Sequence, residues 1–254
     1  EIMQAMNQKK PMVIYSAYQG ETKVEMSSID SLKHYLKILH PGLIAVEPHT
    51  GKVKAWVGGL DYKYFQYDQI EAPRQVGSVF KPVVYSAAIH YGARLDAYYK
   101  NEQKTYKEYD NWTPRNSDND YTGYYTLKGA LSKSINTIAV EVLLQTGIEN
   151  TLVHAHNLGI HSELPQYPSL ALGVADIPLS EMIKPYMAFA NNGKLTQPYY
   201  LSEIKDKDGK ILYQAPQAEF QEVLPAEEAH IMSNILSAVI EEGTGRRLKS
   251  NYGL

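Results

Sequence analysis

The stretch Arg74-Gln75-Val76-Gly77-Ser78-Val79-Phe80-Lys81-Pro82 is the most informative part of the sequence. Ser78 and Lys81 are three residues apart, and residues with this spacing lie on the same face of a helix. Pro82 limits where that helix can begin, because proline is tolerated in a helix only near its start. We therefore expect a helix from about Ser78 to His90, with the serine at its positively polarised end.

A serine hydroxyl next to a lysine amine is a combination that supports nucleophilic catalysis. The hydroxyl is a weak nucleophile until a base removes its proton, and lysine is a base only when neutral, although its ordinary pKa is about 10.4. Burial lowers that pKa, and Phe80, Val83 and Val84 are apolar neighbours able to bury Lys81. Spacing alone leaves the simpler interpretation open, in which Ser78 caps a helix and Lys81 lies in solvent.

A second hydroxyl and an amide follow in the stretch Ala-Leu-Ser-Lys-Ser-Ile-Asn at 130–136. Ser134 can relay a proton to a leaving group, and Asn136 can hold both a lysine amine and a substrate backbone. A similar Ser-Asp-Asn pattern at 117–119 lies in a polar stretch, where these residues favour turns. Ser134 and Asn136 are therefore the better candidates to act with the first pair.

Composition excludes several other kinds of site. The chain has 254 residues, a formal net charge of −3 and no cysteine, so it offers no disulfide, no cysteine nucleophile and no thiolate zinc site. The charge gives no reason to bind nucleic acid. His154 and His156 do not share a helix face, so we expect no metal and no cofactor. Ser202 and Lys205 repeat the Ser-x-x-Lys spacing, but they lie in a predicted strand. Residues three apart in a strand point to opposite faces, so we interpret these two as a surface pair.

The order of the predicted elements is strands, then a run of helices, then strands again. This order favours an α+β fold with an antiparallel sheet and a mainly helical subdomain over alternating α/β units. No apolar run reaches the ~18 residues that a membrane helix needs. Hydrophobic periodicity and turn residues predict these elements: a hairpin over 12–26, a helix from Ser27 to Pro41, a hairpin over 43–57, helices over 78–90, 125–144, 150–160, 180–190 with Ser180 as its cap and 225–241, a hairpin over 199–213, and a long loop over 100–120.

Six short strings occur in the order typical of one family: Arg-Gln-Val-Gly-Ser-Val-Phe-Lys-Pro (74–82), Trp-Thr-Pro-Arg-Asn (112–116), Ala-Leu-Ser-Lys-Ser-Ile-Asn (130–136), Ala-Leu-Gly (171–173), Phe-Ala-Asn-Asn-Gly (189–193) and Glu-Glu-Gly-Thr-Gly (241–245). Together they resemble the transpeptidase domain of class A penicillin-binding proteins. The resemblance implies the penicillin-binding and β-lactamase-like fold over residues 41–254. Residues 1–40 resemble the linker, a hairpin plus helix, that joins this domain to the family's glycosyltransferase domain.

The resemblance also implies a role for each candidate residue. Ser78 matches the acyl-enzyme nucleophile, Lys81 its general base, and Ser134 and Asn136 the second active-site motif. The implied activity is D,D-transpeptidation of peptidoglycan stem peptides that end in D-Ala-D-Ala, with covalent inhibition by β-lactams. The implied partners are those stem peptides, a glycosyltransferase domain in the same parent chain and other wall-synthesis proteins. The implied location is the outer face of the bacterial cytoplasmic membrane, with the membrane anchor outside this chain.

One departure from the family pattern concerns its third motif, of the Lys-Thr-Gly kind on a strand. Lys104-Thr105 is followed by Tyr106, and Gly243-Thr244-Gly245 has no lysine before it. The family pattern places this motif about where the chain stops, so we expect the domain to lack its C-terminal strands. A fragment without these strands lacks one side of the substrate cleft, and we expect it to be inactive on its own. Two alternatives stay open: a D,D-carboxypeptidase or β-lactamase-type hydrolase on the same fold, and a non-catalytic module that binds stem peptides.

Overall fold

The computed structural model describes residues 2–253. Their contacts divide the chain into two compact units. Unit 1 contains the residues up to Leu43 together with Trp56–Glu71, and unit 2 contains Ile44–Ala55 together with the residues from Ala72 onward. The boundary that the sequence suggests between residues 40 and 41 stays a prediction. No helix among the described residues combines the length and the apolar character needed to cross a membrane.

Unit 1 is built on the predicted N-terminal hairpin. The hairpin is antiparallel from the pair Lys9–Ser27 to the pair Ser16–Gly20, and Gly20 has the positive φ of +67° that its tight turn requires. The helix that follows begins as predicted, because Ser27 Oγ accepts a hydrogen bond from the backbone N–H of Asp30 at 3.1 Å. The elements are α1 (Ile2–Asn7), β1 (Lys9–Ser16), β2 (Gly20–Ser27) and α2 (Ser28–Leu36).

The end of α2 differs from the prediction. The helix stops at Leu36, several residues before Pro41. Leu36 and Leu39 are 77% and 85% exposed, so no buried apolar face stabilises a further turn. Because most helical stability in proteins comes from packing, periodicity without burial does not extend the helix.

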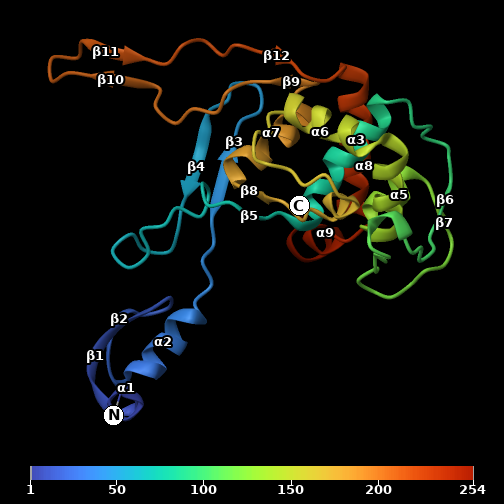
Figure 1. Cartoon of the computed structure of the whole chain (residues 1–254). Coiled ribbons are helices and arrows are strands. Elements are labelled where there is room, and N and C mark those ends of the chain that lie inside the picture. The colour runs from blue at the N-terminus through green and yellow to red at the C-terminus, as the bar shows by residue number, and fades with distance from the viewer. Residues whose placement is uncertain (1, 254) are drawn as a thin grey trace. The chain divides into compact units, whose positions relative to one another are not determined.

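Unit 2 holds the hydrophobic core, which is mainly helical. Helix α3 is buried on all sides from Lys81 to Ala88 and packs against α5, α6 and α8, as Figure 1 shows. A helix surrounded in this way belongs to the centre of a core. The helices of unit 2 are η1 (Gly77–Phe80), α3 (Lys81–His90), η2 (Lys107–Tyr109), α4 (Leu127–Ser132), α5 (Asn136–Thr146), α6 (Ile148–Asn157), η3 (Pro168–Leu172), α7 (Leu179–Ala190), α8 (Ala226–Glu241) and α9 (Arg246–Tyr252).

Three helix predictions need correction. The α-helical part of the Ser78 helix begins only at Lys81, after the 3₁₀ turn η1. The single helix expected over 125–144 is two helices, α4 and α5, separated by a break at 133–135. The residue that caps α7 is Pro178, and not Ser180. In addition, α9 was not predicted by the apolar pattern, and none of its described residues is buried.

The described strands pair only two at a time. Five of the pairs are antiparallel: β1–β2, β5–β8, β6–β7, β9–β12 and β10–β11. Strands β3 and β4 form a further pair. The α+β class with antiparallel pairing and a helical subdomain is therefore confirmed. The remaining strands are β3 (Leu43–Val46), β4 (Val53–Val57), β5 (Arg74–Gln75), β6 (Tyr99–Lys100), β7 (Tyr124–Tyr125), β8 (Asp176–Ile177), β9 (Lys194–Leu195), β10 (Glu203–Lys205), β11 (Ile211–Gln214) and β12 (Gln221–Glu222).

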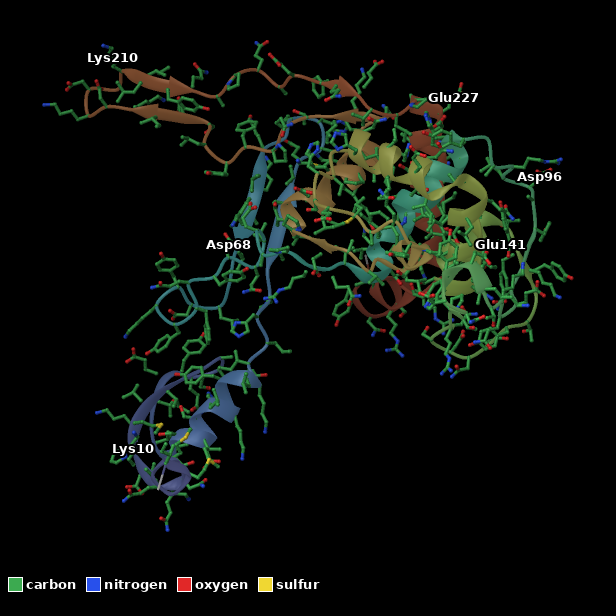
Figure 2. The ribbon with its side chains drawn as sticks, in the orientation of Figure 1. Lys10, Asp68, Asp96, Glu141, Lys210 and Glu227 are labelled. Carbon is green, nitrogen blue, oxygen red and sulfur yellow. The ribbon has the colours of Figure 1, made fainter. Side chains whose placement is uncertain are left out.

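Charged side chains mark the surface of these elements. Figure 2 shows Glu141 on α5, Glu227 at the start of α8 and Lys210 in the β10–β11 hairpin. The hairpin is exposed along both strands. Its loop is held by Asp206, whose side chain accepts hydrogen bonds from the N–H groups of Asp208 and Lys210 at 2.9 Å each. The strands of this hairpin are confirmed, and their burial pattern places them outside the core.

Candidate active site

Ser78 is exposed in the 3₁₀ turn η1, where neighbouring segments hold the backbone. The N–H of Gly77 donates to the carbonyl of Gly173 at 3.0 Å, and the Tyr186 hydroxyl donates to the carbonyl of Val79 at 2.8 Å. Gly77 and Gly173 both have positive φ. A Cβ on Gly173 would lie 1.9 Å from the Gly77 carbonyl oxygen, so only glycine allows the two backbones to meet and fix this turn.

Lys81 is completely buried at the start of α3. Its Nζ donates to the Ser134 carbonyl at 2.6 Å, to Ser134 Oγ at 2.8 Å and to Asn136 Oδ1 at 2.6 Å. Burial lowers the pKa of Lys81 to about 8, because a charged ammonium loses its hydration there. Phe80, Val83 and Val84, the apolar neighbours in the sequence, are all fully buried as well. The interpretation of Lys81 as a solvated surface residue is wrong.

Ser134 links the other two side chains. Its Oγ donates to Ser78 Oγ at 3.1 Å and accepts from Lys81 Nζ. It lies in the break between α4 and α5, with a φ of +57°. The N–H of Ser134 donates to the carbonyl of Leu131, and the N–H of Ile135 to that of Ala130. These two bonds form a Schellman motif in which Ser134 occupies the left-handed position that glycine usually fills.

Asn136 is the first residue of α5. Its Oδ1 accepts from Lys81 Nζ, and its Nδ2 donates to the carbonyl of Arg115 at 2.7 Å. The structure therefore brings all four predicted site residues into one connected group. The group contains a solvent-exposed hydroxyl, a second hydroxyl and a buried amine, connected by hydrogen bonds of 3.1 Å and 2.8 Å. When Lys81 is neutral and the two hydroxyls rotate to donate toward it, such a chain can carry a proton from a nucleophile to a base.

Residues from two further motif strings contact the backbone next to the site, at Ser132 and at Asn136. The N–H of Thr244 donates to the carbonyl of Ser132, at the end of α4, at 3.1 Å. A Cβ on Gly243 would lie 2.2 Å from that same carbonyl oxygen. Asn116, from the Trp-Thr-Pro-Arg-Asn string, accepts the N–H of Asn136 at 3.0 Å. The sequence alone did not predict a role in the site for Thr244, Gly243 or Asn116, because nothing local in the sequence shows which distant backbone atoms these residues contact.

The rival patterns lie apart from this group of bonds. Ser117-Asp118-Asn119 forms a turn, as predicted, in which Asp118 Oδ1 accepts the N–H of Asp120 at 3.0 Å. Lys205 is exposed and pairs with Glu203. Within residues 2–253, no cluster of three or more histidine, cysteine or acidic side chains is placed to hold a metal ion.

Comparisons with known proteins agree with this geometry. Residues 42–252 match the family described as the penicillin binding protein transpeptidase domain, and residues 1–39 match the family described as the penicillin-binding protein middle domain. Penicillin-binding protein 1A of Aquifex aeolicus is 32% identical over 250 residues, which cover 96% of this chain and 33% of that protein. Penicillin-binding protein 1A of Neisseria gonorrhoeae is 32% identical over 224 residues, which cover 82% of this chain and 27% of that protein.

Solved structures show the same fold. The crystal structure of penicillin-binding protein 1A from Haemophilus influenzae has a TM-score of 0.79 at 23% identity, covering 94% of this chain and 40% of that chain. Penicillin-binding protein A from M. tuberculosis, as an imipenem acyl-enzyme complex, has a TM-score of 0.71 at 17% identity, covering 81% of this chain and 58% of that chain. The chain spans a third or less of the length of these two curated relatives. From the family match over residues 42–252 and the 1A relatives, we conclude that the chain belongs to the transpeptidase domain family of class A penicillin-binding proteins.

Proposed function

We propose that this chain is a serine D,D-transpeptidase domain that cross-links peptidoglycan stem peptides. The observation that carries the proposal is the connected path from Ser78 Oγ through Ser134 Oγ to Lys81 Nζ. Ser78 is exposed and can meet a substrate, whereas Lys81 is buried with a pKa lowered to about 8. A nucleophile in solvent contact and a base kept partly neutral are the two properties that acylation of serine needs.

In the proposed first step, Ser78 Oγ attacks the carbonyl carbon between the two D-Ala residues of a donor peptide. The hydroxyl proton passes to Lys81 Nζ, directly or through Ser134 Oγ. The peptide C–N bond then breaks, and the leaving amine takes a proton back along the same path. D-Ala is released, and the donor peptide remains as an ester on Ser78. Asn136 holds Lys81 in line with this path during the transfer.

In the proposed second step, a free amine of a neighbouring stem peptide attacks the ester carbonyl. The C–O bond to Ser78 breaks, the amine gives its proton to Lys81, and Ser78 recovers a proton. Water attacking the same ester would give a carboxypeptidase, or a β-lactamase if the ester came from a β-lactam. The two outcomes share every side chain described above, so the product distinguishes them.

β-Lactams are proposed to acylate Ser78 in place of the donor peptide. The imipenem acyl-enzyme of penicillin-binding protein A from M. tuberculosis, which shares this fold, supports the proposal. We also propose that the chain acts at the outer face of the bacterial cytoplasmic membrane, in a parent protein that carries a glycosyltransferase domain and works with other wall-synthesis proteins. The match to penicillin-binding proteins 1A supports this placement.

The test is to mix the full-length protein with a stem peptide ending in D-Ala-D-Ala and a second peptide with a free amine. Mass spectrometry should find D-Ala and the cross-linked product in equal amounts, and neither with Ser78→Ala. Ser202→Ala is the matched control, because Ser202 and Lys205 have the same spacing on an exposed surface, and it should leave the rate unchanged. Hydrolysis without cross-linking would indicate the carboxypeptidase, and peptide binding without any release of D-Ala would indicate a non-catalytic module.

A further inference from the structure

The start of α5, which carries Asn136, is capped by a residue from a distant loop. The first N–H groups of a helix have no partner within the helix and need acceptors elsewhere. Ile135, which precedes α5, provides no side-chain cap. Instead, Asn116 Oδ1 accepts the N–H of Asn136 at 3.0 Å and the N–H of Thr137 at 3.1 Å. One side-chain oxygen from the loop therefore satisfies two backbone groups of the turn that holds Asn136.

Asn116 is itself held by a buried polar group. Its Nδ2 donates to Asn101 Oδ1 at 2.9 Å and to the carbonyl of Asp120 at 2.7 Å. Asn101 Oδ1 also accepts the Thr137 hydroxyl at 2.8 Å. Asn101, Asn116 and Thr137 are only 3%, 6% and 4% exposed. Buried amides with satisfied hydrogen bonds have one low-energy orientation, because rotation would leave donors facing donors.

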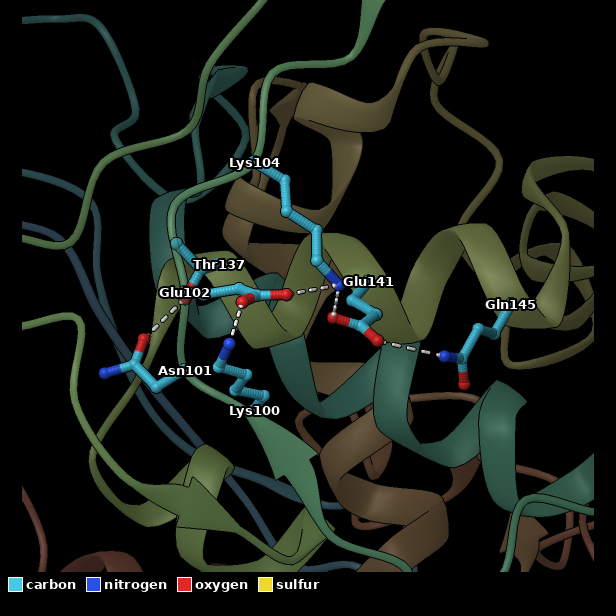
Figure 3. Close-up of polar contacts among 7 residues, drawn as sticks. All are labelled: Lys100, Asn101, Glu102, Lys104, Thr137, Glu141 and Gln145. Atoms are coloured by element: carbon cyan, nitrogen blue, oxygen red, sulfur yellow. Dashed lines mark hydrogen bonds and ion pairs between the residues drawn. The ribbon is translucent and has the colours of Figure 1, made fainter.

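A second link between the loop over 100–120 and α5 is an ion pair at the protein surface. Lys104 donates to Glu141, one turn further along the helix, at 3.0 Å. Figure 3 shows this pair beside Glu102, and shows the Asn101–Thr137 bond at the other end of the same segment. Lys104 is 40% exposed, so its ion pair adds little stability. Because the loop is attached to α5 in two ways, a variant that cuts only the ion pair can be compared with a variant that removes only the cap of α5.

We propose that Asn116 is a positioning residue for acyl transfer: by capping α5, it fixes the backbone of Asn136 so that Asn136 Oδ1 stays on Lys81. The proposal rests on the proposed function above. Asn116 touches neither Lys81 nor Ser78 in any bond described, and it acts only through Asn136 and Thr137. Asn101 orients Asn116 in turn. The string Trp-Thr-Pro-Arg-Asn at 112–116 thereby gains a role in the site, since the backbone carbonyl of Arg115 accepts from Asn136 Nδ2 and Asn116 caps the helix of Asn136.

The test measures acylation of the full-length protein by a fluorescent penicillin across pH 6 to 10, with thermal unfolding in parallel. Asn116→Ala should slow acylation of the folded protein at pH 7 by about ten-fold or more, since two buried N–H groups lose their acceptor. The midpoint of the acid limb should also move to higher pH. A loosened first turn of α5 admits water to Lys81, and burial is what lowers the pKa of Lys81.

Lys104→Gln is the matched control, because it cuts the outer link between the same loop and the same helix. It should leave both the rate and the midpoint unchanged. If Asn116→Ala does not fold, Thr137→Val decides the question. It keeps the side-chain shape, removes the bond to Asn101 and should slow acylation by about two- to five-fold. Reduced melting temperature with an unchanged rate and midpoint would show that Asn116 is only structural, and absence of acylation in the unaltered protein would instead refute the proposed function.

Discussion

At the scale of single residues, the site depends on Ser134 in a backbone conformation that suits glycine. Ser134 has a φ of +57° at the left-handed position that ends α4. A residue with a Cβ is strained there. In this conformation the hydroxyl of Ser134 connects Ser78 to Lys81. Under the proposed function, the residue trades local stability for a position in the proton path, as strained residues at active sites often do.

This trade predicts different effects for two small substitutions. Ser134→Ala and Ser134→Gly both remove the hydroxyl, so both should slow β-lactam acylation by roughly a hundred-fold. Only Ser134→Gly also relieves the strained φ, so it should be more stable than Ser134→Ala by about 1 kcal/mol. Urea denaturation of both variants measures the difference. Equal stability of the two variants would show that no strain is stored at this position.

Lys81 predicts a pH dependence of stability. Its pKa is about 8 when folded, against an ordinary value of 10.5. Between these values the unfolded chain binds more protons, so the free energy of unfolding rises with pH from about 8 to about 10.5, by up to about 3 kcal/mol. Below pH 8 the cost of burying the charge is fully present. The difference in free energy of unfolding between the protein and Lys81→Met should therefore depend on pH. The lysine protein should become more stable relative to the variant as pH rises from about 8 to about 10.5, and a constant difference would contradict the lowered pKa.

The four candidate residues could be proposed from the sequence, but the geometry that brings them together could not. Ser78, Lys81, Ser134 and Asn136 were singled out because their residue types and spacings express a chemical need and because they lie in strings that resemble the motifs of one family. The support residues Asn116 and Gly243 were missed because their partners, Asn136 and Ser132, are far away in the chain. Both residues contact backbone atoms of their partners. Because every residue has the same backbone atoms, no residue type in the sequence indicates these contacts.

At the scale of elements, the decisive feature is the break between α4 and α5. The residues from Leu127 to Thr146 contain no proline, and their apolar spacing continues across the break, so periodicity predicts one helix. Glycine is the usual sign of a helix end, and here Ser134 takes its place. The break turns the chain so that Ser134 and Asn136 both face Lys81. The residue type at position 134 therefore gives no sign of the helix end that the backbone makes there.

The close contact between Gly77 in η1 and Gly173, which follows η3, predicts that one added methyl group will strongly reduce stability. Gly173→Ala would place a Cβ 1.9 Å from the Gly77 carbonyl oxygen, at a φ of +73°. We expect a loss of several kcal/mol of stability and a displaced Ser78, because both backbone strain and a hard clash apply. Gly92→Ala is the control, since Gly92 has a φ of +91° with nothing within 4 Å, and it should cost about 1 kcal/mol. Similar losses in both variants, measured by thermal unfolding, would contradict the close approach.

At the scale of the whole molecule, the chain divides into two compact units. Unit 1 contains an aromatic cluster in which Phe65 lies 5.4 Å from Tyr15, 6.2 Å from Tyr35 and 4.6 Å from His40, between ring centroids. All four site residues belong to unit 2. Sequence order could not show that Trp56–Glu71 belongs with unit 1, because local patterns say nothing about which distant segments pack together.

This division predicts that the units respond separately to mutation. Phe65→Ala should weaken the packing of unit 1, with faster amide hydrogen exchange in β1, β2 and α2. Removing a half-buried aromatic ring costs apolar contacts with all three of its partners. Acylation by penicillin should change by less than about two-fold, because every bond of the site joins residues of unit 2. A large loss of acylation would show that unit 1 contributes to the site.

The most direct test of the central claim is to find where penicillin attaches. The full-length protein is incubated with benzylpenicillin, digested, and the modified peptide is identified by mass spectrometry. The account predicts a single adduct on Ser78, no adduct in Ser78→Ala, and slower formation in Ser134→Ala and Lys81→Met. An adduct on a different serine, or one that persists in Ser78→Ala, would contradict it.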